Sequence, residues 1–237
     1  MNMVRATLVY VFVAVYILIL SPIGLAWALL SGDSHLIFSL ARFCIRVAGL
    51  MAGVTVRIRG KEKILPGCTY VFLSNHQGNI DAPVLAHAIP RDWRALMKKE
   101  VMRLPVLSLV LRQVKMVPID RSEPQKARDG IERGVGLLRE GYSFIAFPEG
   151  TRSRDGRLGE FKKGVFVMAL KAEAPIVPIS ILNSSKIQPP GAYSIRPGVV
   201  EVIFHDPIPT KDMRMEERDE LVRLTRDAIA SGLTIHH

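Results

Sequence analysis

The segment Thr69–Asp81 has the sequence TYVFLSNHQGNID and joins two kinds of pattern. Its first part, Thr69–Ser74, is a short run of apolar, aromatic and β-branched residues, which is typical of a buried strand. The polar residues Asn75–Asp81 follow, and Ala82–Ala88 continues as a short helical stretch. A buried strand that ends in a polar loop and leads into a helix is the repeating unit of an α/β domain.

The same alternation of strands and helices continues from Thr55 to the end of the chain. Seven short segments are rich in β-branched or aromatic residues and bounded by Gly, Pro or charge, so we expect strands there. They are Thr55–Arg59, Thr69–Ser74, Arg94–Lys98, Lys115–Ile119, Ser143–Phe147, Ile176–Leu182 and Val199–Phe204. Helices are expected at Ala82–Ala88, Glu100–Arg112, Pro124–Glu140, Phe161–Glu173 and Asp212–Ser231. The pattern predicts an α/β domain over residues 55–237, with a mixed, largely parallel sheet flanked by helices.

Residues 1–54 differ from this body because they are apolar and carry few charges. Ala6–Ser31 has no charged residue over 26 positions, enough to cross a hydrocarbon core of ~30 Å at ~1.5 Å per residue. Pro22 and Gly24 can instead break this run into a helix over about residues 4–20 and a turn, with a second helix afterwards. A cleaved signal peptide fits less well, because the apolar run exceeds the usual ~7–15 residues. We therefore expect residues 1–54 to anchor the chain in a membrane, either as a span or as a two-helix hairpin in one leaflet.

The next stretch, His35–Ala52, predicts an amphipathic helix that lies in the headgroup region of a membrane. Arg42 and Arg46 stand one helical turn apart among apolar residues. Arginines in such a place extend toward lipid phosphates while their stems stay in apolar surroundings.

Charge narrows the class of partner. The chain has 237 residues and a net charge of +10, and residues 57–130 hold 14 Lys/Arg against 7 Asp/Glu. Anionic membranes, phosphorylated substrates and nucleic acid would all suit this balance. No nucleic-acid-binding signature accompanies it, so nucleic acid is not expected as a partner. The two cysteines, Cys44 and Cys68, form neither a disulfide framework nor a metal-binding pair, which fits a reducing compartment.

His76 and Asp81 follow the strand quoted above and can meet if Asp81 opens the next helix. The carboxylate of Asp81 would then hold one imidazole nitrogen and leave the other as a general base. The alternative is an ordinary capped loop in which Asn79 or Asp81 caps the helix. Ser74 lacks the Gly-x-Ser-x-Gly setting of a protein nucleophile, so direct activation of an external hydroxyl is the simpler hypothesis.

Basic residues also follow expected strand ends. Lys98, Arg121 and Arg152 each come after a strand, and parallel strands place such residues at one edge of the sheet. Together they predict a phosphate site, although each alone is more often a solvated surface cation. Glu149 could bind a hydroxyl of the substrate or pair with Arg152.

Four blocks, in order, resemble the glycerolipid acyltransferase family. They are Asn75-His76 with four residues before Asp81, Val117–Arg121, Phe147–Ser153 and Ile176–Ile179. The resemblance covers residues 55–210 and is greatest to the bacterial 1-acylglycerol-3-phosphate acyltransferases, which make phosphatidic acid. The first and third blocks together are highly specific. The second differs from its common version, with Val114–Val117 where Gly and Phe are usual.

The resemblance implies a role for each matched residue. His76 would be the general base and Asp81 the group that orients it. The residues implied for the acceptor phosphate and glycerol are Lys98, Arg121, Glu149, Gly150, Thr151 and Arg152. Val177 and Pro178 would belong to the acyl or donor side.

The resemblance further implies an enzyme that uses an acyl thioester, either acyl-CoA or acyl carrier protein, with no metal and no other cofactor. Its acceptor would be lysophosphatidic acid, acylated at the free sn-2 hydroxyl, and its partner surface the phospholipid bilayer. The catalytic domain would face the cytoplasm from the inner membrane, held by a hairpin in one leaflet. Glycerol-3-phosphate or another lysophospholipid stays open as the acceptor. A non-catalytic lipid-binding protein and a metal-dependent phosphoester hydrolase are the rival classes.

Overall fold

Seven strands form one sheet in the part of the chain that the computed structural model describes, which is residues 2–103, 105–120, 123–153 and 155–234. Within these ranges the side chains of Lys98, Pro105, Val106 and Pro124 are not described. The strands are β1 (Val54–Arg59), β2 (Val71–Ser74), β3 (Trp93–Lys98), β4 (Val117–Ile119), β5 (Ser143–Ala146), β6 (Ile176–Leu182) and β7 (Gly198–Phe204). Their order is β1-β7-β6-β2-β5-β3-β4, and every neighbouring pair is parallel except β6 with β7. The expected mixed, largely parallel sheet is confirmed.

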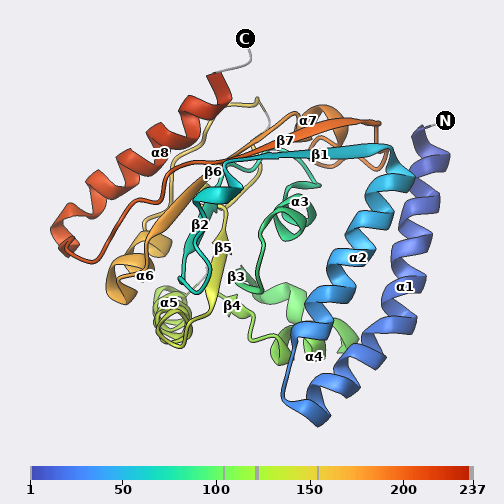
Figure 1. Ribbon diagram of the computed structural model, residues 1–237, viewed down its shortest axis with the longest axis horizontal. Coiled ribbons are helices and arrows are strands. Elements are labelled where there is room, and N and C mark those ends of the chain that lie inside the picture. The colour runs from blue at the N-terminus through green and yellow to red at the C-terminus, as the bar shows by residue number, and fades with distance from the viewer. Residues whose placement is uncertain (1, 104, 121–122, 154, 235–237) are drawn as a thin grey trace.

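Helices cover both faces of this sheet (Figure 1). They are α1 (Asn2–Ser31), α2 (His35–Ala52), α3 (Asp81–Ala88), α4 (Pro105–Gln113), α5 (Pro124–Arg139), α6 (Gly164–Ala172), α7 (Ser184–Ile187) and α8 (Arg218–Thr234). Side chains of α5, α6 and α8 share one core with the sheet, whereas α3 and parts of α1 and α2 pack against its other face. Alternation along β2 serves both cores, because Phe72 points to the second face and Val71 and Leu73 to the first.

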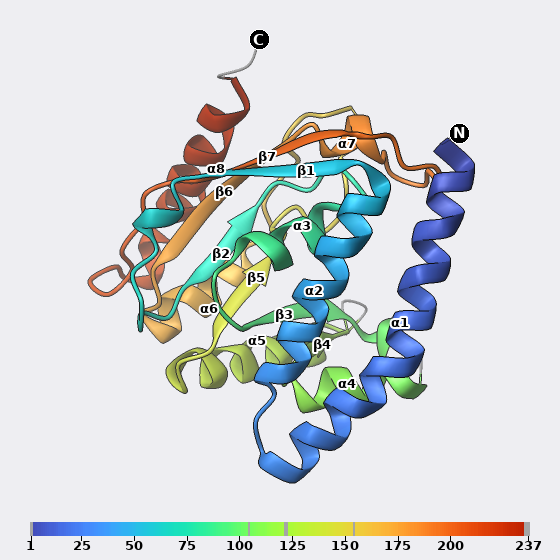
Figure 2. The same ribbon diagram turned by 45° about the vertical axis from the view of Figure 1, so that its right-hand side comes forward.

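The helices α1 and α2 form a hairpin beside the sheet (Figure 2). The predicted break at Pro22 and Gly24 is wrong, because α1 continues through both residues. Pro22 removes only one backbone donor, a loss that long apolar helices tolerate. Gly24 faces α2, where an added Cβ would lie 3.3 Å from side-chain atoms of Ile37 and Leu40. The chain turns instead at residues 32–34, where Gly32 has a φ of +74°.

Both hairpin helices are long and apolar enough to cross a membrane. Only Ala6, Val9, Gly24 and Ala28 of α1 are buried, and its large apolar side chains face outward along most of its length. These features point to membrane association. The choice between a span and a one-leaflet anchor, and the division of the chain at residue 54, stay predictions.

The expected helix Glu100–Arg112 is divided in the structure. A 3-10 helix covers Lys99–Arg103, and α4 begins at Pro105. Proline suits the first position of a helix, because its missing N–H would have no partner there, so α4 begins at this residue. The last helix, α8, likewise begins at Arg218 rather than at Asp212, after a 3-10 turn at Met215–Glu217.

Strand direction decides where the polar loops meet. The strands β2, β3, β4, β5 and β6 all run the same way. The residues that follow them therefore gather at one edge of the sheet, as ligand sites do in parallel sheets. This edge, referred to below as the carboxyl edge, carries both His76 and the Phe147–Ser153 block.

Candidate active site

His76 and Asp81 form a hydrogen-bonded pair at the carboxyl edge. His76 lies just after β2 and Asp81 is the first residue of α3. The imidazole Nδ1 is 2.8 Å from the Asp81 Oδ2 atom, and the two side chains are 20% and 0% exposed. Because a carboxylate oxygen accepts, Nδ1 carries the proton in this pair. The Nε2 atom then keeps its lone pair, as a general base requires.

The Asp81 carboxylate has two further donors that fix its position. The backbone N–H groups of Gln77 and Gly78 donate to the same Oδ2 atom, over 2.6 Å and 2.8 Å. Gly78 is needed here, because an added Cβ would lie 2.8 Å from backbone atoms of Ser184. The loop therefore wraps around a buried carboxylate that also orients His76. The N-cap residue of α3 is Ile80 and no side chain caps the helix, so the alternative of a helix cap at Asn79 or Asp81 is wrong.

Glu149 fixes the backbone of His76 from the next loop. Its side chain is 5% exposed, and its Oε1 atom accepts the N–H of His76 over 2.8 Å while Oε2 accepts the N–H of Gly159 over 2.8 Å. The Ser153 N–H donates to the His76 carbonyl over 2.7 Å. Both Glu149 oxygens thus accept from backbone groups, and no hydrogen bond or ion pair joins Glu149 to Arg152 among the described residues. Sequence reasoning offered a substrate hydroxyl or Arg152 as its partner.

Phe147 completes the surroundings of the imidazole. Its ring stacks on the His76 ring, with centroids 3.9 Å apart and planes inclined by 15°. The ring orientation of His76 is therefore set on one face by an aromatic ring and at one edge by Asp81.

Asn75 is a site residue that the sequence analysis did not single out. Its Nδ2 group donates to the Ile181 carbonyl over 2.8 Å, and its Oδ1 atom accepts the Ile181 N–H over 2.7 Å. This paired contact continues the β2–β6 ladder with a side chain, since the strand register ends at Ser74. Asn75 is fully buried and so holds the start of the catalytic loop against β6.

Asn79 is the second residue that sequence reasoning missed, beyond its possible role as a cap. Its Oδ1 atom accepts a hydrogen bond from the Arg152 guanidinium, and its Nδ2 group donates to the Ala192 carbonyl over 3.1 Å. Its N–H donates to the Gln188 carbonyl over 2.9 Å. Gln188 in turn donates to the Tyr10 hydroxyl of α1. Asn79 therefore connects the catalytic loop, the Arg152 loop and the first helix.

The structure describes only some of the residues that were predicted to bind a phosphate. The exposed Arg152 reaches the catalytic loop through Asn79. Arg121 lies outside the described residues. Lys98 ends β3, where its backbone pairs with Ile119 of β4, but its side chain is not described. The neighbouring Lys99 forms an ion pair with Asp120.

Gly150 and Thr151 form the turn between Glu149 and Arg152. Gly150 has a φ of +72°, a conformation that favours glycine, and its N–H donates to the Phe147 carbonyl over 3.0 Å. Thr151 is exposed at this turn. The turn brings Arg152 back over the carboxyl edge.

Val177 and Pro178 lie inside the sheet rather than on a cavity wall. Both are buried in β6, and Pro178 stands opposite Leu73 of β2. Their assignment to the acyl or donor side stays a prediction.

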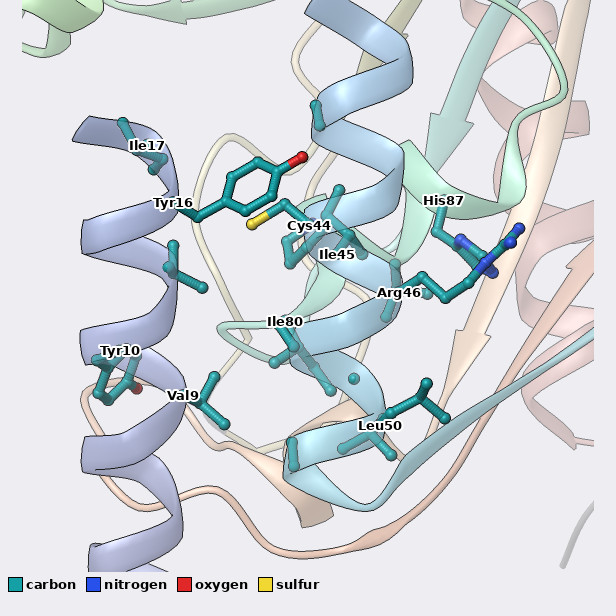
Figure 3. Close-up of a pocket in the computed structure, with 18 of the residues that line it drawn as sticks. Val9, Tyr10, Tyr16, Ile17, Cys44, Ile45, Arg46, Leu50, Ile80 and His87 are labelled. Carbon is teal, nitrogen blue, oxygen red and sulfur yellow. The ribbon is translucent and has the colours of Figure 1, made fainter. Parts of the chain in front are cut away.

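An apolar cavity of about 630 Å³ lies next to the catalytic loop. Figure 3 shows Tyr16 of α1 and Cys44 of α2 facing each other across part of it. Asn79 and Ile80 of the catalytic loop also line the cavity. Its volume is within the range of small-molecule sites, ~300–1,000 Å³. The site thus combines an oriented histidine, a nearby arginine and an apolar cavity, an arrangement suited to activating a hydroxyl beside a lipid chain.

The chain belongs to the Acyltransferase family, whose model matches residues 55–182, more than half of the sequence. Its curated relatives carry one recurrent name. The chloroplastic 1-acyl-sn-glycerol-3-phosphate acyltransferase BAT2 of Brassica napus is 39% identical over 153 residues, which are 64% of this chain and 44% of that protein. The enzyme of the same name from Borreliella burgdorferi is 27% identical over 199 residues, 84% of this chain and 80% of that one.

The chain spans about half the length of the plant relatives, 44% of the Brassica protein and 49% of LPAT1 of Arabidopsis thaliana. A crystal structure of the 1-acyl-sn-glycerophosphate (LPA) acyltransferase PlsC from Thermotoga maritima superposes with a TM-score of 0.81. The alignment covers 98% of this chain and 96% of that one at 23% identity. At this identity the likeness establishes the fold, which the two chains share over nearly their whole length.

Proposed function

We propose that this chain transfers a fatty acyl group from an acyl thioester to the free sn-2 hydroxyl of 1-acylglycerol-3-phosphate, giving phosphatidic acid. The observation that carries the proposal is the His76 Nδ1 to Asp81 Oδ2 hydrogen bond of 2.8 Å, which leaves Nε2 as the basic atom. The names of the relatives supply the acceptor, since they are called 1-acyl-sn-glycerol-3-phosphate acyltransferases.

The reaction follows from the positions of these groups. Nε2 of His76 removes the proton of the acceptor hydroxyl, and the oxygen attacks the thioester carbonyl to form a tetrahedral intermediate. The carbon–sulfur bond then breaks, and the proton held by His76 passes to the departing thiolate. Asp81 stabilises the imidazolium that exists between these two steps. No acyl-enzyme is required, because the acceptor itself is the nucleophile.

The two ends of the acceptor call for different surroundings. Arg152, with Lys98 and Arg121 from the neighbouring strand ends, would bind the phosphate, for which a guanidinium fork is well suited. Glu149 and Gly150 would act indirectly, by placing His76 and Arg152. The apolar cavity between α1 and α2 would take a fatty acyl chain, because Tyr16, Ile17, Leu40 and Cys44 line it there.

The hairpin of α1 and α2 would hold this site at a membrane surface, where both lipid substrates are found. We propose the cytoplasmic face of the inner membrane, with acyl-CoA or acyl carrier protein arriving from the cytoplasm. The outward-facing apolar residues of α1 support contact with lipid.

The test is a thiol-release assay on the purified full chain in detergent micelles, with acyl-CoA and acyl carrier protein each used as donor. Lysophosphatidate, glycerol-3-phosphate, lysophosphatidylcholine and no acceptor are compared, and the products are identified by mass. We expect release to depend on lysophosphatidate and to yield phosphatidate. Thiol release with glycerol-3-phosphate but not with lysophosphatidate would show that glycerol-3-phosphate is the acceptor. Tight lysophosphatidate binding without thiol release, from CoA or from the carrier protein, would make the chain a lipid-binding protein and overturn the proposal.

A further inference from the structure

The two arginines of α2 have different environments although they stand one turn apart. Arg42 donates from Nη1 to Asp92 Oδ1 over 3.1 Å, so its charge is balanced by a carboxylate. Arg46 has no ion pair or hydrogen bond within the described part of the chain. It lines the apolar cavity instead. An exposed cation on a cavity wall without a carboxylate is available to an anion from outside the protein.

A second basic group lies near Arg46. His87, in the last turn of α3, lines the same cavity. Burial lowers the pKa of His87 below its ordinary value, and the positive charges of Arg46 and Lys61 lower it further. No carboxylate contributes to this shift. Basic side chains from α2 and α3 thus line one part of the cavity.

This place is separate from the α1–α2 side of the cavity. Figure 3 shows Arg46 and His87 on the side of α2 that faces away from α1, whereas Tyr16 and Ile17 lie on the α1 side. The cavity lining also includes the apolar residues Leu50, Val56, Pro83 and Val84. Leu50 follows Arg46 by one turn of α2, and Pro83 and Val84 precede His87 by one turn of α3. Leu50 is 74% exposed, so this part of the cavity opens outward. We call Arg46 and His87, with these four apolar residues, the basic groove.

We propose that the basic groove binds one anionic phospholipid of the bilayer, with its phosphate between Arg46 and His87 and an acyl chain along Leu50 and Val84. Charge complementarity selects the head, since Arg46, which has no carboxylate partner among the described residues, favours a phosphate, to which the His87 imidazole can also donate a hydrogen bond. The apolar walls suit a hydrocarbon tail. Arg46 belongs to α2, a helix long and apolar enough to cross a membrane, so the bilayer is the expected source of the lipid. The inference concerns a lipid that is bound but not consumed, and it does not depend on acyl transfer.

The helix α3 connects the basic groove to the catalytic pair. The helix begins at Asp81, the partner of His76, and ends near His87. A lipid in the basic groove would therefore stabilise α2 and α3 against each other on the side of the fold that holds the catalytic pair.

The test compares arginines one turn apart. The full chain and the variants Arg46→Gln, His87→Gln and Arg42→Gln are released from phosphatidylcholine vesicles with or without phosphatidylglycerol, and retained lipid is measured by native mass spectrometry. We expect wild type and Arg42→Gln to retain one phosphatidylglycerol, with retention several-fold lower in Arg46→Gln and His87→Gln. Arg46→Lys should restore part of it. Equal retention by Arg42→Gln and Arg46→Gln would overturn the proposal.

Two further arms separate other sources of phosphate. Inorganic phosphate alone is titrated as a competitor. If it displaces phosphatidylglycerol at equal concentration, the site recognises a free anion and the lipid assignment fails. If Arg46→Gln instead raises the KM for lysophosphatidate while phosphatidylglycerol retention is intact, the groove belongs to the acceptor and the proposal also fails. Because retention is measured without a donor, the result does not depend on whether the chain is an acyltransferase.

Discussion

The catalytic loop Asn75–Asp81 and the helix pair α1–α2 line the same cavity, but different forces hold them. The loop is fixed by hydrogen bonds of 2.6–2.8 Å between backbone groups and the buried side chains of Asn75, Asp81 and Glu149, the two carboxylates accepting in each case. The first helix is mostly exposed and is attached through apolar contacts, with polar bonds such as that from the Tyr10 hydroxyl to the Tyr193 carbonyl, over 3.0 Å.

The difference matches what each region has to do. Proton transfer depends on distance and angle, which hydrogen bonds to buried groups define closely. Binding of a hydrocarbon chain depends on apolar area, which is not directional and allows the helices to adjust. Substitutions in the loop should therefore change the rate, and substitutions in the helix pair should change which chain is accepted.

The largest effect in this comparison is expected from Asp81→Asn. An amide can offer an NH₂ group where the N–H groups of Gln77 and Gly78 already donate, and it no longer fixes the imidazole tautomer. We expect kcat to fall by about 10²–10⁴-fold. The matched control is Asp92→Asn, which removes a carboxylate paired with Arg42 far from the loop. If Asp81→Asn kept a kcat close to that of the control, Asp81 would not orient the base.

Glu149→Gln should have the next largest effect. A glutamine has a single carbonyl oxygen, so the N–H of either His76 or Gly159 would lose its acceptor. Displacing a catalytic group by an ångström costs about 10²-fold in rate, and we expect a loss of that order in kcat. The free energy of unfolding should fall by about 1–3 kcal/mol, the usual cost of one buried unpaired group. Glu160→Gln, exposed in the same segment, is the control, and equal behaviour of the two variants would contradict this role.

Arg152→Gln should mainly raise the KM for the acceptor. The loss of a charged hydrogen bond to the phosphate should raise this KM by a factor of about 30. Asn79→Ala should raise the same KM less, because Asn79 only holds the guanidinium in place. Arg157→Gln, an exposed arginine of the same loop, serves as the control. An unchanged KM in Arg152→Gln would remove this residue from the phosphate site.

Cys44→Phe tests the helix pair and should have the smallest effect on rate. The phenylalanine ring is larger than the cysteine side chain and would fill the cavity between α1 and α2, where Cys44 faces Tyr16. We expect the ratio of kcat/KM for palmitoyl over decanoyl donors to fall about 10-fold, within the range for changes of a few methylenes. Cys44→Ala leaves the cavity open and should keep the wild-type ratio. A ratio unchanged by phenylalanine would show that the acyl chain lies elsewhere.

The sequence was enough to predict the sheet and its functional edge. Strands such as Ile176–Leu182 are short β-branched runs, and their alternation with helices indicates parallel pairing. Parallel pairing then places the residues after each strand at one edge, which is how His76 and the Phe147–Ser153 block could be assigned to the same site. The proximity of His76 and Asp81 followed from a strand end and a helix start five residues apart.

The parts that the sequence left open depend on contacts between distant segments. Asn75 and Ile181 are separated by 106 residues, and no local spacing indicates that the asparagine completes a strand ladder. Glu149 could be placed at the site, but its two partners are backbone groups that any residue possesses. Pro22 predicted a helix break from local geometry, whereas packing of Gly24 against α2 keeps α1 continuous. In each case tertiary packing decided among options that the local sequence allowed.

The measurement that tests the account most directly is the kcat of His76→Ala in acceptor-dependent thiol release. The full chain and the variant are assayed with saturating lysophosphatidate and acyl-CoA, and circular dichroism verifies that both are folded. Because His76 Nε2 is the proposed base, we predict a loss of about 10²–10⁴-fold with folding unchanged. A folded His76→Ala variant that released thiol at close to the wild-type rate would contradict the proposed mechanism.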